Sequence, residues 1–234
     1  MARLKDRIAL ITGASRGIGA AVARRFAAEG AHVVLVARTA GGLEEVDDDI
    51  QGAGGQATLV PLDLREFGKI DELGAALFDR FGRLDALVGN AAILGDLTPV
   101  HHMDPDAWDA VIALNVTANW RLLRSFDTLL RASDAGRAIF VTSGAAHGVF
   151  PYWGAYATSK AALETMVRTY AAENAKTSIR ANIVDPGAVR TAMRAQAFPG
   201  EDPMSLAAPE SITDAFVELA ETGCRWTGEV VSVR

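Results

Sequence analysis

The strongest constraint on the fold of this chain is a regular alternation between short apolar runs and longer amphipathic segments. The apolar runs are rich in Val, Ile and Leu and do not alternate strictly with polar residues, which is typical of strands covered on both faces. Strand–helix–strand repetition predicts a parallel sheet with right-handed crossovers. The predicted strands are Ile8–Ile11, His32–Val36, Ala57–Val60, Ala86–Val88, Ala138–Val141, Ser178–Val184 and Glu229–Val233. The clearest predicted helices are Gly17–Glu29, Lys69–Phe81, Trp120–Arg131 and Ala155–Asn174.

The chain length of 234 residues suits one α/β domain, residues 1–234, better than two. No segment has the composition of an interdomain linker, and Gly52–Gly55 is a turn of ordinary length between a helix and a strand. The longest irregular region is Phe198–Pro209. It is either a mobile loop over a site or a plain surface loop.

Charge and cysteine content exclude several classes of protein. The formal net charge is −6 and no basic stripe is visible, so nucleic acid is not expected as a partner. The single cysteine, Cys224, rules out an intramolecular disulfide and a cysteine zinc site, which fits a cytoplasmic location and a reaction without a metal. The apolar run Ile8–Thr12 is too short for a signal-peptide core, and no run is long enough for a membrane helix.

A glycine-rich turn follows the first predicted strand and opens the first predicted helix. Thr12–Gly19 reads Thr-Gly-Ala-Ser-Arg-Gly-Ile-Gly, which differs from the common G-x-G-x-x-G spacing. Its glycines allow a tight turn and a close approach of a pyrophosphate to backbone N–H groups, while the helix N-terminus favours the anion. The predicted cofactor contacts in this turn are Gly13, Ser15, Arg16, Gly17, Ile18 and Gly19.

The same residues also fit a motif of another class of enzyme. Gly13-Ala-Ser-Arg-Gly17 also fits the G-x-S-x-G nucleophile elbow of hydrolases, with Ser15 as the nucleophile. An elbow on the first strand, however, has no upstream strand and loop to supply an oxyanion donor. We therefore favour the dinucleotide interpretation and keep the serine hydrolase as an alternative.

The end of the second strand indicates which nicotinamide cofactor binds. In dinucleotide-binding sheets this position meets the adenosine ribose, and an acid there repels a 2′-phosphate. Here the strand ends in Arg38, and no carboxylate occurs before Glu44. A guanidinium suits a phosphate, and Arg16 is a second candidate for the same group. The sequence thus favours NADP(H) over NAD(H), unless both arginines are ordinary solvated side chains.

Tyr156 and Lys160 form a candidate proton-transferring pair. They lie four residues apart in a predicted helix and share one of its faces. A nearby ammonium favours the phenolate, so Lys160 is expected to lower the pKa of Tyr156 toward the operating pH. Such a pair also occurs often by chance.

Taken together, these motifs resemble the short-chain dehydrogenase/reductase family. The resemblance rests on Thr12 with the three glycines, on Tyr156 with Lys160, and on Ser143 thirteen positions before the tyrosine, and it covers essentially the whole chain. The segments 133–136, 153–156 and 190–195 resemble a bacterial branch whose members mostly have no assigned substrate. Further family landmarks occur in order, namely Asp63-Leu64, Gly89-Asn90-Ala91-Ala92, Asn115, Pro186-Gly187, Val189 and Thr191.

The resemblance implies a fold and a set of roles. The fold is a single Rossmann-type, doubly wound parallel sheet of about seven strands in the order 3-2-1-4-5-6-7, with helices on both faces. Ser143 would stabilise the substrate oxygen, Tyr156 would transfer the proton, and Lys160 would bind the nicotinamide ribose. Asn115 would position a water that links Lys160 to solvent. The remaining cofactor contacts implied are Asp63, Leu64, Asn90, Ala91, Pro186, Gly187, Val189 and Thr191.

This chain departs from the family pattern at a few places. Gly89 and Ala92 replace the usual asparagine and glycine, and Gly144 replaces the second serine after strand five. The glycine-rich tail that usually follows the last strand is missing, because the sequence ends at Arg234. A homodimer or homotetramer is still expected, but the short C-terminus leaves the choice between them open.

The substrate remains the least determined part of the prediction. Apolar side chains near Tyr156 favour a small or medium apolar carbonyl compound or alcohol, and His147 either reaches the pocket or is structural. The preferred direction and the physiological substrate are open. A non-catalytic NADP(H)-binding sensor of the same fold is the main alternative to an enzyme. The apolar candidates for the pocket wall are Leu94, Phe150, Tyr152, Trp153, Met193 and Phe198.

Overall fold

A computed structural model describes residues 2–233 of the chain; Met1 and Arg234 lie outside the described part. Within it, seven parallel strands form one sheet in the order β3-β2-β1-β4-β5-β6-β7. The predicted architecture and strand order are therefore confirmed. The strands are β1 (Ile8–Thr12), β2 (His32–Ala37), β3 (Gln56–Pro61), β4 (Ala86–Gly89), β5 (Arg137–Val141), β6 (Arg180–Asp185) and β7 (Val230–Ser232).

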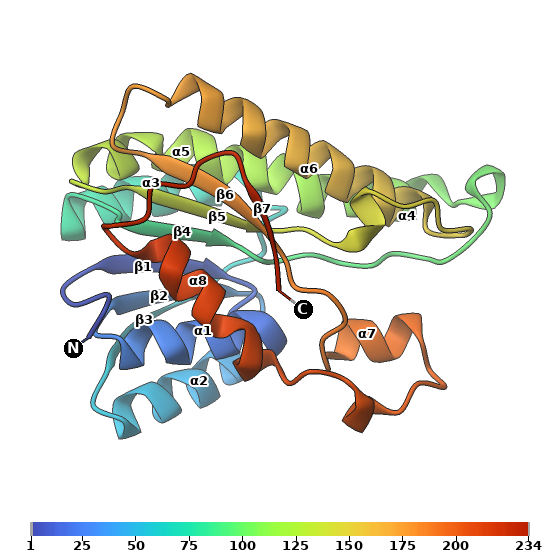
Figure 1. The fold of residues 1–234 in the computed structure, drawn as a ribbon, viewed down its shortest axis with the longest axis horizontal. Helices are drawn as coiled ribbons and strands as arrows, with labels where there is room; N and C mark the ends of the chain where they lie inside the picture. The colour runs from blue at the N-terminus through green and yellow to red at the C-terminus, as the bar shows by residue number, and fades with distance from the viewer. Residues whose placement is uncertain (1, 234) are drawn as a thin grey trace.

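Helices cover both faces of the sheet, as Figure 1 shows. On one face lie α1 (Gly17–Ala28), α2 (Ala40–Gly52) and α8 (Thr213–Ala220), and on the other α3 (Phe67–Phe81), α5 (Ala118–Ala132) and α6 (Gly154–Glu173). Successive strand residues point to opposite faces, so Ile11 joins the core under α1 whereas Leu10 joins the core under α5. This two-sided burial explains the nearly continuous apolar runs of the sequence.

Shorter elements complete the chain at the end of the sheet where the strands finish. They include α4 (Pro105–Ile112), a π-helical segment η2 (Ala113–Thr117), and α7 (Ala192–Ala197). The 3-10 segments are η1 (Val100–His102), η3 (Gly144–Ala146), η4 (Pro203–Ser205) and η5 (Pro209–Ile212). Among the helices of residues 2–233, none is both long and apolar enough to cross a membrane.

Parallel pairing brings the carboxyl ends of all strands to one edge of the sheet. The glycine turn follows β1, Asn90 follows β4, Ser143 follows β5, and Pro186 follows β6. In open α/β sheets this edge is where ligands bind. The fold thus places residues that are far apart in the sequence at one edge, next to the N-termini of α1 and α6.

Candidate active site

The turn between β1 and α1 depends on glycine at specific positions. Gly13 has φ +66° and Gly17 has φ +57°, in the left-handed region that favours glycine. A Cβ at Gly19 would collide with the Gly13 carbonyl oxygen and lie 2.6 Å from Asn90 Nδ2. The glycines therefore produce a cradle of backbone that side chains would fill.

The beginning of α1 is open toward this cradle. Arg16 occupies the N-cap position, and within the described residues no side chain caps the helix. Its first N–H groups are thus left for water or a ligand, and the helix dipole adds partial positive charge. Thr12 Oγ1 accepts hydrogen bonds from Asn90 N (2.9 Å) and Ala91 N (3.0 Å), which fixes the loop after β4 beside the glycine turn.

Arg38 and Asp63 lie together at the ends of β2 and β3. Arg38 is exposed, as is Arg16 in the glycine turn. Asp63 is paired with Arg65 at 2.6 Å, and the hydrogen bond from Arg65 holds the pKa of Asp63 below its usual value, with a smaller contribution from the charge of Arg38. Arg65 was not singled out in the sequence. Leu64, next to the acid, is buried.

The segment after β6 runs back to the glycine turn. Asp185 Oδ1 accepts a hydrogen bond from Gly187 N at 3.1 Å, and Gly187 has φ +66°. Thr191 caps α7 by accepting from Arg194 N at 3.1 Å. A Cβ on Gly17 would lie 3.5 Å from Thr191 Cγ2, so the two predicted cofactor segments are neighbours. Pro186 and Val189 are buried between them.

Tyr156 and Lys160 lie in the first two turns of α6, as the four-residue spacing predicts. Both are buried, with Tyr156 only 7% exposed. Lys160 Nζ lies 5.6 Å from the centre of the tyrosine ring and donates to the Val141 carbonyl oxygen at 2.8 Å. Ser143, at the start of η3, accepts from Ala145 N at 3.2 Å and also interacts with the tyrosine.

The electrostatics of the pair differ from the sequence expectation. Burial raises the pKa of Tyr156 to about 12, the Ser143 side chain opposes that rise, and the charge of Asp185 adds to it. The Lys160 ammonium donates a hydrogen bond to the Val141 carbonyl oxygen. Burial also lowers the pKa of Lys160 to about 8, and the charge of Glu164 opposes that fall.

Asn115 connects α6, the helix that carries Tyr156, to the loop after β4. Its Nδ2 donates to the Ile93 carbonyl oxygen (2.9 Å) and to Ser159 Oγ (3.0 Å), and its Oδ1 accepts from Ile93 N (3.0 Å). Ser159 in turn donates to the Tyr156 carbonyl oxygen at 2.7 Å. Asn115 lies in the π-helical segment η2, a distortion that is frequent at functional sites.

Packing explains why glycine, and not the family's usual asparagine, occupies position 89. A Cβ at this position would collide with the Phe140 ring and lie 2.7 Å from Asn119 Oδ1. The amide of Asn119 occupies this space and donates to the Asn115 carbonyl oxygen at 2.8 Å. The departure from the family asparagine is thus accompanied by a second asparagine one helical turn after Asn115.

An apolar cluster covers Tyr156. Its buried members are Leu94, Ala145 and Tyr156, and Trp153 and Met193 pack against them. Phe198 stacks on Trp153 with ring centres 5.7 Å apart, and Phe150 does so at 6.1 Å. Phe150 and Tyr152 are the most exposed of the expected wall residues, at 50% and 57%, and Tyr152 has φ +76°.

The segment that carries Phe198 is held in place by several contacts. Arg194 lies 3.8 Å above the Phe198 ring and pairs with Glu201 at 2.6 Å. Farther along, Arg190 N donates to the Ala207 carbonyl oxygen at 2.9 Å. The region Phe198–Pro209 therefore adjoins the site and is anchored at both ends, with η4 inside it.

A carboxylate that the sequence analysis did not single out lies on the same helix as Tyr156 and Lys160. Glu164 is buried on α6, where Thr142 Oγ1 donates to it at 2.7 Å and His147 Nε2 contacts it at 2.8 Å. His147 is therefore engaged with Glu164. The signal available in the sequence was the spacing, since Glu164 follows Lys160 by four residues.

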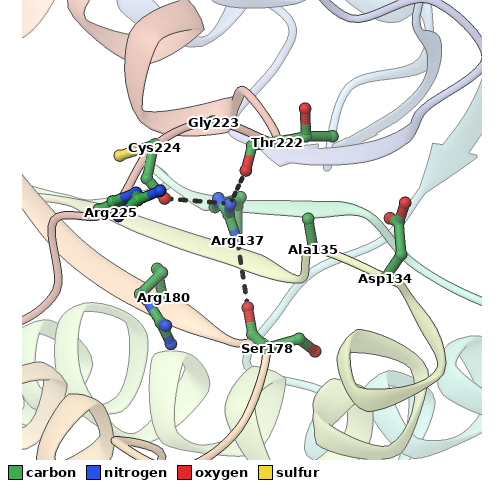
Figure 2. A pocket seen from close by; sticks show the side chains of 9 residues that line it. All are labelled: Asp134, Ala135, Arg137, Ser178, Arg180, Thr222, Gly223, Cys224 and Arg225. Carbon is green, nitrogen blue, oxygen red and sulfur yellow. Dashed lines mark hydrogen bonds between the residues drawn. The ribbon is translucent and has the colours of Figure 1, made fainter.

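A pocket of about 290 Å³ lies at the opposite edge of the sheet, at the beginning of β5 and β6 (Figure 2). It contains Arg137, whose guanidinium donates to the backbone carbonyl oxygens of Thr222 (2.7 Å), Cys224 (3.1 Å) and Ser178 (3.2 Å). These bonds hold the chain before β7 against the sheet. The pocket is thus distant from Ser143 and Tyr156, and its buried arginine has a structural role.

Comparison with known proteins identifies the family. A family model described as short chain dehydrogenase matches residues 7–202. The chain belongs to the short-chain dehydrogenase family. Membership establishes an NAD(P)-dependent oxidoreductase that acts on a CH–OH or C=O group.

Relatives of this short-chain dehydrogenase cover nearly its whole length. An uncharacterized oxidoreductase of Escherichia coli K12, YciK, is 38% identical over 92% of this chain and 86% of its own. A short chain dehydrogenase of Shigella flexneri complexed with NADP is 37% identical, with a TM-score of 0.95 over 99% of this chain and 98% of its own. One from Escherichia coli CFT073 complexed with NADPH is also 37% identical, with a TM-score of 0.93 over the same shares.

Family membership overturns the hydrolase interpretation of the glycine turn. A serine hydrolase would need a histidine beside Ser15, and the histidines make other contacts. His147 contacts Glu164, His32 contacts Thr58 Oγ1 at 2.8 Å, and His101 and His102 stack on each other in η1. Ser15 instead packs against the start of α2, because a Cβ at Gly42 would lie 2.9 Å from its Cβ. Within residues 2–233 no cluster of three His, Cys, Asp or Glu side chains suits a metal ion, and the metal-free reaction stays a prediction.

Proposed function

We propose that this chain, as one domain over residues 1–234, is an NADP(H)-dependent oxidoreductase in which Tyr156 transfers the proton. The observation that carries the proposal is the meeting of Asn115, Ser143, Tyr156 and Lys160 at the sheet edge that also holds the glycine turn. When bound, the nicotinamide gives or takes the hydride.

The residues present fit a dinucleotide. Glycine at positions 13 and 19 lets the turn pack tightly, since a Cβ there would collide with neighbouring protein atoms, and the uncapped start of α1 offers N–H donors that would bind a pyrophosphate. Thr191 lies next to the glycine turn, and with Gly187 from the same segment it would hold the nicotinamide end. This arrangement supports the cofactor contacts that the family resemblance implies.

The preference for NADP(H) is supported by Arg38 and Arg16. Both are exposed, and Arg38 acts on Asp63 at the adenosine end of the site. A guanidinium there would pair with a 2′-phosphate. The two structural relatives in complex with NADP or NADPH support the same cofactor for this chain.

Each catalytic side chain has a defined task in this proposal. Tyr156 holds its proton at neutral pH, because burial raises its pKa, and can therefore donate it to the oxygen of a carbonyl group whose carbon receives the hydride. Ser143 donates a hydrogen bond to that oxygen and stabilises its negative charge. Lys160 would bind the ribose, and Asn115 would position the water that returns a proton from solvent.

We propose a small or medium apolar ketone, aldehyde or alcohol as substrate. The side chains that pack against Tyr156 are apolar, namely Leu94, Trp153 and Met193. Because Tyr156 is almost fully covered, apolar side chains packed against it, such as Trp153 and Met193, would have to move for a substrate to reach it. A screen in which only highly charged compounds react would contradict this substrate class.

The decisive experiment is Tyr156→Phe, with a panel of carbonyl compounds and alcohols followed by NADPH absorbance. We expect turnover to fall by about 10²- to 10⁴-fold, the usual contribution of general acid–base catalysis, while NADPH binding is kept. Tyr170→Phe is the matched control, because this phenol on the same helix bonds Asp127 at 2.7 Å and is given no part in the reaction.

The outcome separates an enzyme from a sensor. A wild-type protein that binds NADPH and reduces none of the compounds would favour the non-catalytic NADP(H)-binding protein. Full activity in Tyr156→Phe would contradict the role of the tyrosine.

Assembly and location remain proposals. We propose a homodimer or homotetramer, since exposed aromatic side chains such as Trp120 on α5 offer contact area. The expectation of a cytoplasmic location rests on the single cysteine.

A further inference from the structure

Glu164 is a buried carboxylate that the proposed reaction does not use. It lies on α6 one helical turn after Lys160 and is 4% exposed. An isolated buried carboxylate is costly, so such a group is retained only where hydrogen bonds and a counter-charge compensate its desolvation.

Both carboxylate oxygens of Glu164 have a hydrogen-bond partner. Thr142 Oγ1 donates to Oε1 at 2.7 Å, and His147 Nε2 lies 2.8 Å from Oε2. Since a carboxylate only accepts, the imidazole Nε2 must carry the hydrogen of that bond. The two donors come from the end of β5 and from the loop after η3, so the carboxylate is fixed from outside its own helix.

The charge of Glu164 acts on Lys160. Residues four apart on a helix share a face, and Glu164 raises the pKa of Lys160 against the opposing effect of burial. The other titratable groups around this pair are Tyr156 on α6, His147 after η3, and Asp185 at the end of β6, which acts on Tyr156. Across from them, η2 contributes the neutral amide of Asn115.

We propose that Glu164 is a positioning residue, the buried counter-charge that keeps Lys160 protonated, and that Thr142 and His147 hold it in place. The proposal rests on the proposed function, because an ammonium at position 160 matters for binding the ribose and assisting Tyr156. The side chain of His147 is 50% exposed, so the support of this carboxylate extends from the catalytic helix to the protein surface.

The first test is a titration of Lys160 in the free protein, without cofactor or substrate. The lysines are Lys5, Lys69, Lys160 and Lys176, so ¹³Cε labelling gives few signals, and Lys160→Arg assigns the one of interest. In Glu164→Gln we expect the Lys160 midpoint to fall by about one pH unit or more, because a nearby opposite charge is removed. Glu164→Asp keeps the charge and should remain near the wild-type midpoint.

The second test is the pH profile of kcat/KM for carbonyl reduction. The alkaline limb should move to lower pH in Glu164→Gln, because Lys160 then loses its proton earlier, and Glu164→Asp should restore it. The matched control is Glu173→Gln, which removes a carboxylate from the exposed end of the same helix and should leave the limb unchanged.

The two tests separate this inference from the proposed function. If the wild-type protein turns over no substrate, the proposed function fails, while the lysine titration still decides the role of Glu164. Should Glu164→Gln not fold, Glu164→Met replaces the carboxylate with an apolar side chain of similar length and carries the same expectation. A Lys160 midpoint unchanged in the folded variant would overturn the proposal.

Discussion

Burial and a neighbouring positive charge have opposite effects on the pKa of Tyr156. The apolar cover of Leu94, Trp153 and Met193 excludes water from the phenol and raises its pKa to about 12. The neutral phenol suits proton donation, whereas proton removal from an alcohol requires that pKa to fall. Lys160 can supply this fall only after its ammonium leaves the Val141 carbonyl.

Arg38 carries the prediction of cofactor preference. In Arg38→Asp we expect the ratio of kcat/KM for NADPH over NADH to fall by about 10- to 100-fold, because a charge-assisted hydrogen bond to the 2′-phosphate is replaced by repulsion. The measurement is the initial rate with each cofactor at a fixed carbonyl substrate.

Arg168→Asp controls for the change in net charge, since Arg168 is exposed on α6 two turns beyond Lys160. It should keep the wild-type ratio. Equal affinity of the wild-type enzyme for NADH and NADPH would contradict the role of Arg38.

At the scale of elements, the turn from β1 to α1 is fixed by backbone contacts. The Gly13 carbonyl and the Asn90 amide occupy the space that a side chain at Gly19 would need. Thr12 then ties the loop after β4 to the same turn. The candidate pyrophosphate site is therefore formed by two β–α connections.

Gly19→Ala tests this arrangement. We expect the dissociation constant for NADPH to rise at least about tenfold and the free energy of unfolding to fall by about 1–3 kcal/mol, because backbone must move to admit the methyl group. Fluorescence titration with NADPH and urea unfolding measure the two effects.

Gly41→Ala is the matched substitution on α2, where a Cβ would meet no atom within 4 Å. It should stabilise the protein by up to about 1 kcal/mol, because alanine is the better helix former. Wild-type NADPH binding in Gly19→Ala would show that the turn tolerates a side chain.

At the scale of the whole molecule, Arg137 joins the last strand to the rest of the sheet. Its Nε donates to the Glu221 carbonyl oxygen at 3.0 Å, and its other nitrogens bond Thr222 and Cys224 (Figure 2). Burial lowers the pKa of this guanidinium, with a further contribution from the charge of Arg7, so the carbonyl dipoles must compensate a desolvated charge.

Arg137→Met should lower the free energy of unfolding by about 2–3 kcal/mol, because several carbonyl groups lose a charged donor together. Urea unfolding measures the loss. Arg225→Met is the control from the same pocket, since Arg225 is exposed and makes no side-chain hydrogen bond within the described part of the chain. Equal stabilities of the two variants would argue against a stabilising role for the hydrogen bonds of Arg137.

The sequence by itself determined the sheet, its parallel direction and most of the candidate site. Two-sided burial leaves apolar runs such as His32–Val36, and the turn glycines and the spacing of Tyr156 and Lys160 follow from local geometry. These features are local or periodic, so they can be recognised without knowing which segments meet.

Only the tertiary structure decided which groups surround the catalytic pair. Burial lowers the pKa of Lys160, and its ammonium donates to the Val141 carbonyl oxygen. Thr142 and His147 contact Glu164 from other elements. Desolvation and charge interactions depend on distances between segments far apart in the chain, and sequence spacing carries no record of them.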